Sequence, residues 1–157
     1  MASKTYPLEP LVEVRKSHAD AAQRELGSAI REREARLTEL DAARARTLEH
    51  AEARSETERA ERDALNEGAL RAVDLLRQDA WQLERAREAE RLLAAERLSA
   101  EAAVAATDEE NRVREETATR LGELKAVERD RARFLEAKER AAAAKEEEAA
   151  EEAWRPR

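Results

Sequence analysis

Histidine and carboxylate side chains are the residues of this sequence that could carry catalysis or bind a metal. His18 and His50 lie 32 positions apart; neither follows a glutamate by three positions, and neither has a second histidine four positions away. The Glu-x-x-His pattern of di-iron bundles and the His-Glu-x-x-His zinc helix are therefore absent from the sequence. We interpret both histidines as solvated and predict no metal site.

The other catalytic patterns also lack their residues. Loops that hold phosphates need clustered glycines, whereas Gly27, Gly68 and Gly122 are isolated from one another. Carboxylates are abundant, but acid–base catalysis needs a concave, partly desolvated site that shifts their pKa, and two paired helices would enclose no such pocket. We therefore predict that the chain is not an enzyme and binds no cofactor.

Composition excludes a layered globular domain. Among 157 residues, Leu, Ile, Val and Phe number only 25, whereas charged residues make up 43% and the net charge is −7. The negative charge and the 3% of aromatic residues argue against nucleic-acid binding. The chain has no cysteine, no apolar run of bilayer length and no short apolar segment near Met1 typical of a secretory signal. We expect a soluble cytoplasmic protein with no membrane insertion.

Ala, Glu, Arg and Leu dominate, and these are strong helix formers. Pro7 and Pro10 are typical of a helix start, and no further proline occurs until Pro156. Asn66-Glu67-Gly68 is the best turn, in preference to helix starts at Ser55 or Thr107. The prediction is a single all-α unit over 1–157, a long antiparallel two-helix coiled-coil hairpin, with helices over about 8–65 and 69–153 and a turn at about 66–68.

Apolar residues at coiled-coil spacing predict which side of each helix faces the other. The predicted contact positions are Leu26, Ile30, Leu37 and Leu40 in the first helix; Val73, Leu76, Ala80 and Leu83 early in the second; Leu92, Ala106, Val113, Val127 and Phe134 farther on; and Leu93, Ala100, Leu121 and Leu135 in the adjoining phase. Trp81, next to Ala80, is expected to be partly buried between the helices. Residues 41–64 are half charged and carry one large aliphatic side chain, Leu48, so we expect the loosest packing there.

The segment over 6–16 is the most informative part of the sequence. Leu8, Leu11, Val12 and Val14 form the densest apolar cluster of the first helix, at its start. Such a cluster suggests a docking site for a partner, although the same residues could instead pack on the second helix.

This segment, Tyr6-Pro-Leu-Glu-Pro10 followed by Leu11 and Arg15-Lys16, resembles the start of the FliJ/YscO family, and in particular its injectisome branch. That family comprises small coiled-coil stalk proteins of bacterial type III export machines. The rest of the chain is similar to the family only in kind, as a cysteine-free helical hairpin rich in Ala, Glu and Arg.

The resemblance implies a central stalk that binds in the pore of the hexameric export ATPase and couples it to the export gate and to secretion chaperones, at the cytoplasmic base of a secretion apparatus. It places the ATPase-facing end at Tyr6, Pro7, Leu8, Glu9, Pro10, Leu11, Val12, Val14, Arg15 and Lys16, with Phe134 and Leu135 beside them by hairpin geometry.

Two alternatives remain at this point. A structural or scaffold coiled coil would self-associate through the same heptad positions and would gain stability with concentration, whereas the stalk is expected to be a monomer when isolated. A regulator of a secretion chaperone would instead fold its Ala/Glu-rich tail on binding.

Overall fold

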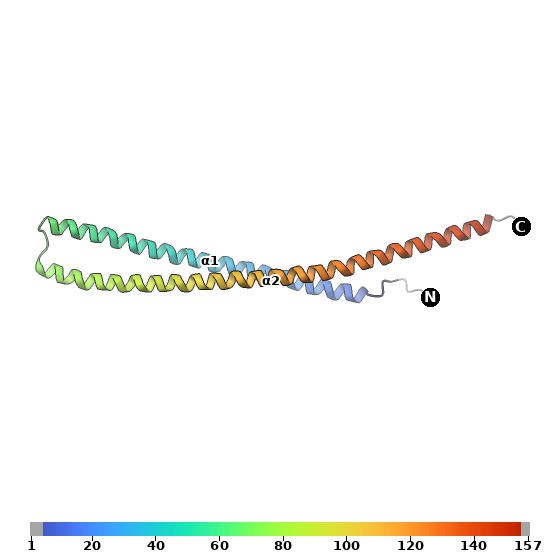
Figure 1. Cartoon of the computed structure of the whole chain (residues 1–157), viewed down its shortest axis with the longest axis horizontal. Coiled ribbons are helices and arrows are strands. Elements are labelled where there is room, and N and C mark those ends of the chain that lie inside the picture. The colour runs from blue at the N-terminus through green and yellow to red at the C-terminus, as the bar shows by residue number, and fades with distance from the viewer. Residues whose placement is uncertain (1–4, 155–157) are drawn as a thin grey trace. The chain divides into compact units, whose positions relative to one another are not determined.

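The structure, a computed structural model, describes residues 5–154 of the chain. They form two helices, α1 (Glu9–Asn66) and α2 (Ala72–Trp154), and no strand occurs among these residues (Figure 1). The predicted all-α antiparallel hairpin is confirmed. The predicted bounds of about 8–65 and 69–153 differ from those observed by one residue, except at the start of α2, and Pro156 lies outside the described residues.

The end of α1 is a Schellman motif, which explains why the chain turns here. Gly68 has a φ of +69°, in the left-handed region that a side chain disfavours. The amide of Ala69 donates to the carbonyl of Ala64 at 3.0 Å, and the amide of Gly68 donates to that of Leu65 at 3.1 Å. These bonds satisfy carbonyls that the end of the helix would otherwise leave without partners.

The start of α2 is set by Asp74. Its Oδ2 accepts a hydrogen bond from the backbone amide of Arg71 at 3.0 Å, while the Arg71 carbonyl accepts from the amides of Asp74 and Leu75. This is the carboxylate half of a capping box, with Arg71 at the N-cap position. The cap holds the helix start at Ala72, three residues after the predicted position.

Contacts divide the chain into two units. The first contains the described residues up to Ser28 together with those from Asn111 on, and the second contains Ala29–Glu110. Each unit therefore pairs one stretch of α1 with one stretch of α2.

The core of the first unit is built from small side chains. Val12, Ala19 and Ala22 of α1 are buried, as are Val113 and Thr117 of α2. The Thr117 hydroxyl lies 2.8 Å from the Val113 carbonyl oxygen and 3.1 Å from that of Ala22 on the other helix. Its donor is thus satisfied inside a narrow contact that alanine makes possible.

In the second unit the contact combines apolar and charged residues. Leu40, Ala43 and Ala103 are buried, and Arg33 pairs with the buried carboxylate of Glu110 at 3.0 Å. The prediction is confirmed for Leu40, while Leu26, in the first unit, and Ile30 are half-buried. It is wrong for Leu37, which is exposed.

The start of α2 faces the opposite way from its prediction. Val73, Leu76, Ala80 and Leu83 are all exposed. The half-buried residues there are Asp74, Gln78 and Trp81, so partial burial of Trp81 is confirmed. Gln78 donates from Nε2 to Glu61 of α1 at 2.6 Å. The predicted apolar side of α2 is therefore turned away from α1 in this stretch.

Farther along α2 the predicted heptad phase is confirmed. The residues of that phase are buried or half-buried: Leu92, Ala106, Val113, Val127 and Phe134. In the adjoining phase, one position off the contact line, Ala100 and Leu121 are half-buried, whereas Leu93 and Leu135 are exposed. Every side chain over 135–154 is exposed, including Trp154. Within the described residues, neither helix contains a stretch apolar enough to cross a membrane.

Candidate partner-binding site at the start of α1

The segment before α1 is fastened to α2 by Tyr6. Its hydroxyl donates to Oδ2 of Asp130 at 2.5 Å, and its ring lies 5.5 Å from the ring of Phe134, centroid to centroid. The tyrosine is buried, and Phe134 is half-buried. The hydrogen bond to Asp130, followed by burial and the nearby negative charges, raises the pKa of Tyr6 to about 12. Tyr6 therefore remains a protonated donor over the physiological range.

A two-point ion pair lies next to this contact. Nε and Nη2 of Arg131 approach the two carboxylate oxygens of Glu9 at 2.9 and 2.8 Å. Such paired geometry fixes orientation as well as distance. Because Glu9 is the first residue of α1, the ion pair holds the helix start against α2. We call the contacts of Tyr6 and Glu9 with Asp130, Arg131 and Phe134 the N-terminal latch.

Leu8 occupies the N-cap position of α1. Its carbonyl accepts hydrogen bonds from the amides of Leu11 and Val12, while its side chain points into solvent with 47% of its area exposed. The helix start between Pro7 and Pro10 is confirmed.

Leu8, Leu11 and Val14 follow one another at three-residue spacing, so they lie along one side of the first two turns. Leu11 is half-buried and Val14 is 49% exposed. We call these three residues the outer stripe. Val12, by contrast, is 6% exposed and packs inward. The packing interpretation therefore applies to Val12, whereas docking at Leu8 and Val14 stays a prediction.

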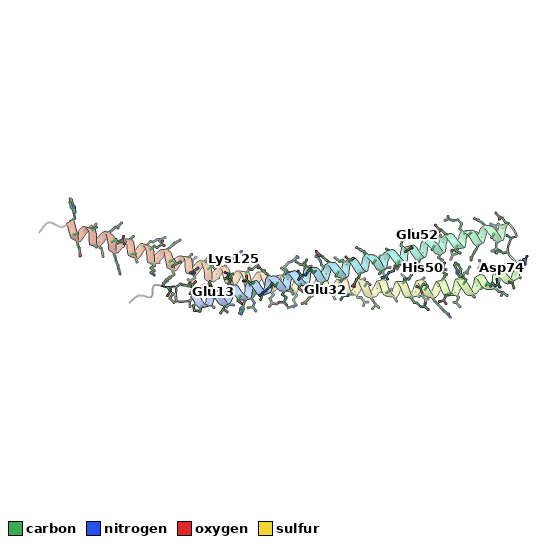
Figure 2. All side chains as sticks on the ribbon, turned by 180° about the vertical axis from the view of Figure 1, so that it is seen from behind. Glu13, Glu32, His50, Glu52, Asp74 and Lys125 are labelled. Carbon is green, nitrogen blue, oxygen red and sulfur yellow. The ribbon has the colours of Figure 1, made fainter. Side chains whose placement is uncertain are left out.

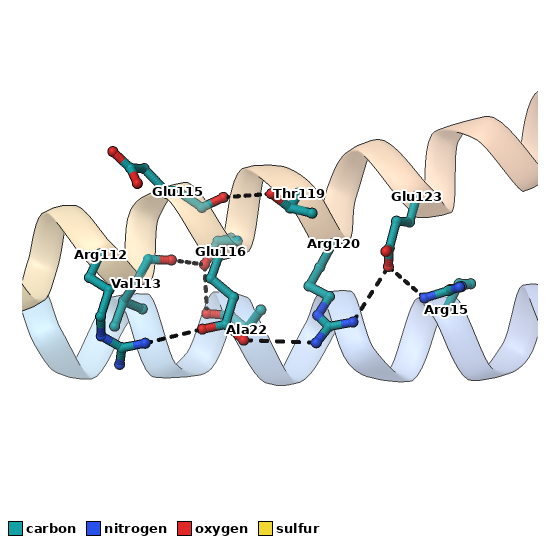
Figure 3. A network of polar contacts seen from close by, with 10 residues as sticks. Arg15, Ala22, Arg112, Val113, Glu115, Glu116, Thr119, Arg120 and Glu123 are labelled. Atoms are coloured by element: carbon teal, nitrogen blue, oxygen red, sulfur yellow. Dashed lines mark hydrogen bonds and ion pairs between the residues drawn. The ribbon is translucent and has the colours of Figure 1, made fainter.

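A chain of ion pairs continues along the same unit (Figure 3). Arg15 of α1 meets Glu123 at 2.5 Å, Glu123 also lies 3.6 Å from Arg120, and Arg120 lies 3.9 Å from Glu116. Arg15 is thus paired with a carboxylate of α2, whereas Lys16 is exposed. Lys16 is the basic side chain of the predicted site that points to solvent without such a contact.

The predicted site residues divide into two groups. Three of them make contacts with α2, namely Tyr6, Glu9 and Arg15; Phe134 of α2 receives the Tyr6 ring, and Val12 is buried. Five are exposed: Pro7, Leu8, Pro10, Val14 and Lys16; Leu135 on α2 is also exposed, and Leu11 is half-buried. Any partner of the free chain would first meet the exposed group.

Sequence reasoning missed Asp130, Arg131 and Glu123, which hold the latch and Arg15. Their sequence signal is weak, because Asp130 and Arg131 belong to a run of alternating charges and Glu123 is one of many glutamates in α2. Only the partner, more than a hundred positions away, distinguishes them.

The interpretation of both histidines as solvated is wrong for His50. His18 is exposed, but His50 lies on the side of α1 toward α2, whereas Glu52 projects outward (Figure 2). The buried Nε2 of His50 has no hydrogen-bond partner. The His50 ring and Trp81 line a hollow of about 260 Å³. The guanidinium carbon of Arg85 lies 4.4 Å from the centre of the Trp81 ring. His50 occupies a contact position of the heptad, where a half-buried side chain is expected.

Over residues 5–154, no cluster of three or more potential metal ligands is present. The arrangement at the start of α1 offers shape, apolar area and fixed charge, which are the means of protein recognition. Comparisons with family models, with curated proteins and with solved structures find no match to this chain.

Proposed function

We propose that this chain is the central stalk of a bacterial type III export apparatus. In this proposal the start of α1 binds within the pore of the hexameric export ATPase, at the cytoplasmic base of the secretion machine, and the hairpin couples the ATPase to the export gate and secretion chaperones. The observation that carries the proposal is the outer stripe, because Leu8, Leu11 and Val14 lie in the segment that resembles the stalk family.

The N-terminal latch gives the outer stripe a fixed position. Tyr6 and Glu9 are each held by a residue of α2, so the first turns of α1 are ordered before any partner arrives. A preordered surface loses less conformational entropy on binding than a flexible tail would. The latch therefore favours recognition of a helical end, with the stripe as its apolar anchor.

Symmetry limits the contacts that such a stalk could make. A single hairpin inside a six-fold ring cannot present the same surface to six subunits at once. We therefore expect one or two ATPase subunits to contact the outer stripe at a time, with modest affinity. Weak, replaceable contacts suit a stalk that must follow nucleotide-driven changes around the ring.

The proposal is tested by mixing the purified chain with the export ATPase of the same organism and measuring both binding and ATP hydrolysis. The double variant Leu8→Asp with Val14→Asp should abolish binding and remove any change in hydrolysis rate. Both positions are half-exposed, so the helices should still form. Helical content by circular dichroism checks this.

The control is Leu48→Asp, the same type of substitution on α1 at a position that is 60% exposed and outside the outer stripe. It should bind like the unaltered chain. If the unaltered chain neither binds the ATPase nor alters its hydrolysis, or if the double variant binds as well as Leu48→Asp, the proposed function is wrong.

A further inference from the structure

A second apolar surface lies on α2, close in sequence to the turn. Val73, Leu76, Ala80 and Leu83 are separated by steps of three, four and three residues, which places them on one side of the helix. Their exposure is high, at 56% for Val73, 70% for Leu76 and 55% for Leu83. We call these four residues the α2 stripe.

The α2 stripe cannot be covered by turning α2 toward α1. The larger residues of α1 that are half-buried in this stretch are mainly polar, among them His50, Arg54, Thr57 and Glu61, and the apolar ones are the small Ala53 and Ala64. Glu61 is engaged by Gln78, which holds the polar side of α2 inward. A rotated α2 would lose this bond and would place leucines against charged groups, so an apolar surface that covers the stripe would have to come from another molecule.

We propose that the α2 stripe binds the α2 stripe of a second copy of this chain, with the two helices antiparallel about a two-fold axis. A surface that pairs with itself needs only one set of apolar residues. In this alignment Val73 shares a layer with Leu83 of the other copy, and Leu76 shares one with Ala80. Each layer thus joins a larger side chain to one that leaves room for it.

The charges beside the stripe favour the antiparallel direction. In antiparallel helices the residue that follows the second core residue of a heptad faces the residue at the same heptad position of the partner. Arg77 follows Leu76 and Glu84 follows Leu83, so Arg77 of each copy faces Glu84 of the other. The two-fold axis makes two such contacts. In parallel helices Asp79 would instead face Glu84, also twice, and both contacts would be repulsive. Glu84 is free to be shared, because it is 60% exposed and its contacts with Arg87 and Arg91 are long, at 3.7 and 3.9 Å.

The pair is expected to be weak and closed. Four layers are short for a two-stranded coiled coil, and Asp79 would lie near the axis opposite its own copy. A two-fold contact uses the same surface on both copies, so it produces dimers and no filament. The stripe lies in the second unit, whereas residues 6–16 lie in the first, so the inference does not rest on the proposed function. It departs from the monomer expected of an isolated stalk and gives the chain the self-association expected of a scaffold coiled coil.

The experiment is sedimentation equilibrium of the full purified chain, without any partner, from micromolar to millimolar concentration. The unaltered chain should pass from monomer to dimer over this range. Leu76→Asp should remain monomeric, whereas Leu98→Asp, a control at a 68% exposed position of the same helix outside the stripe, should dimerise normally. A chain that stays monomeric throughout, or association that survives Leu76→Asp, would overturn the proposal.

A charge exchange tests the direction. Arg77→Glu alone should weaken the association constant about tenfold, because two attractive contacts become repulsive. Combining it with Glu84→Arg should restore most of the lost association, since the pair is then reversed and attractive again. Failure of the double variant to recover, with helical content unchanged, would exclude the antiparallel arrangement.

Discussion

Nη1 of Arg33 lies 3.0 Å from Oε2 of Glu110, and the Glu110 side chain is only 2% exposed. The two helices of the second unit are thus joined, close to the limits of that unit at Ala29 and Glu110, by a charge taken almost entirely out of water. Arg33 retains about a third of its exposure, so solvent still screens its side of the pair. A buried carboxylate of this kind specifies how the helices align but adds little net stability.

Replacing Glu110 by Gln should therefore destabilise the chain, by about 2 kcal/mol, because Arg33 then loses its counter-charge in a narrow contact. Replacing both residues, Arg33 by Met and Glu110 by Leu, should bring the unfolding free energy back to within about 1 kcal/mol of the unaltered chain. Urea unfolding followed by circular dichroism measures both. A double variant as unstable as the single one would show that the pair contributes large net stability.

Two glycines should respond in opposite directions to the same substitution. Gly68→Ala should lower the free energy of unfolding by about 1 kcal/mol, since alanine disfavours the left-handed φ of the Schellman motif. Gly122→Ala should raise it by up to about 1 kcal/mol, because this position is inside α2 and a Cβ there would meet nothing within 4 Å. Thermal unfolding of the two variants compares them directly, and shifts of equal sign would contradict the turn geometry.

Where the structure agrees with sequence-based expectation, the deciding signal is local. Asn66 and Gly68 mark a turn by their own backbone preferences, and Val113 and Phe134 mark the inner side of α2 by heptad spacing. These features need no knowledge of the other helix.

The orientation of the α2 stripe could not be predicted in this way. Leu76 and Leu83 follow heptad spacing as well as Leu92 does, but α1 has no large apolar side chain opposite them. The side of α2 that faces α1 is therefore set by the later stretch of α2, where apolar contacts with α1 do form. The sequence does not predict that Arg33 and Thr117 lie at the helix contact either. A polar side chain at such a position can be identified only once its partner, distant in the sequence, is known. The candidate site stays a prediction, and which residues of its segment face outward depends on the contacts of Tyr6 and Glu9 with α2, which the sequence does not reveal.

The N-terminal latch predicts a specific titration. Tyr6 is the single tyrosine of the chain, so the near-ultraviolet absorbance of tyrosinate reports on it alone. Its midpoint should be at about pH 12. Because the pKa is raised on folding, the latch contributes fully below the ordinary tyrosine value near pH 10 and is lost as the pH rises through the folded value.

Asp130→Ala should move the Tyr6 midpoint back toward the ordinary value, since it removes both the hydrogen-bond acceptor and the nearest negative charge. Asp130→Asn keeps an acceptor oxygen without the charge and should give an intermediate midpoint. An unaltered chain that titrates near pH 10, indistinguishable from Asp130→Ala, would mean that Tyr6 is not held by α2.

The most direct test of the central claim, that the outer stripe at the start of α1 is the surface that meets the export ATPase, is site-specific photocrosslinking inside the working secretion machine. A photoreactive amino acid replaces Leu8 in one strain and Leu98 in another, since both side chains are exposed. The proposed function predicts that position 8 captures the ATPase subunit and position 98 does not. Capture of the ATPase from position 98 with none from position 8 would contradict it.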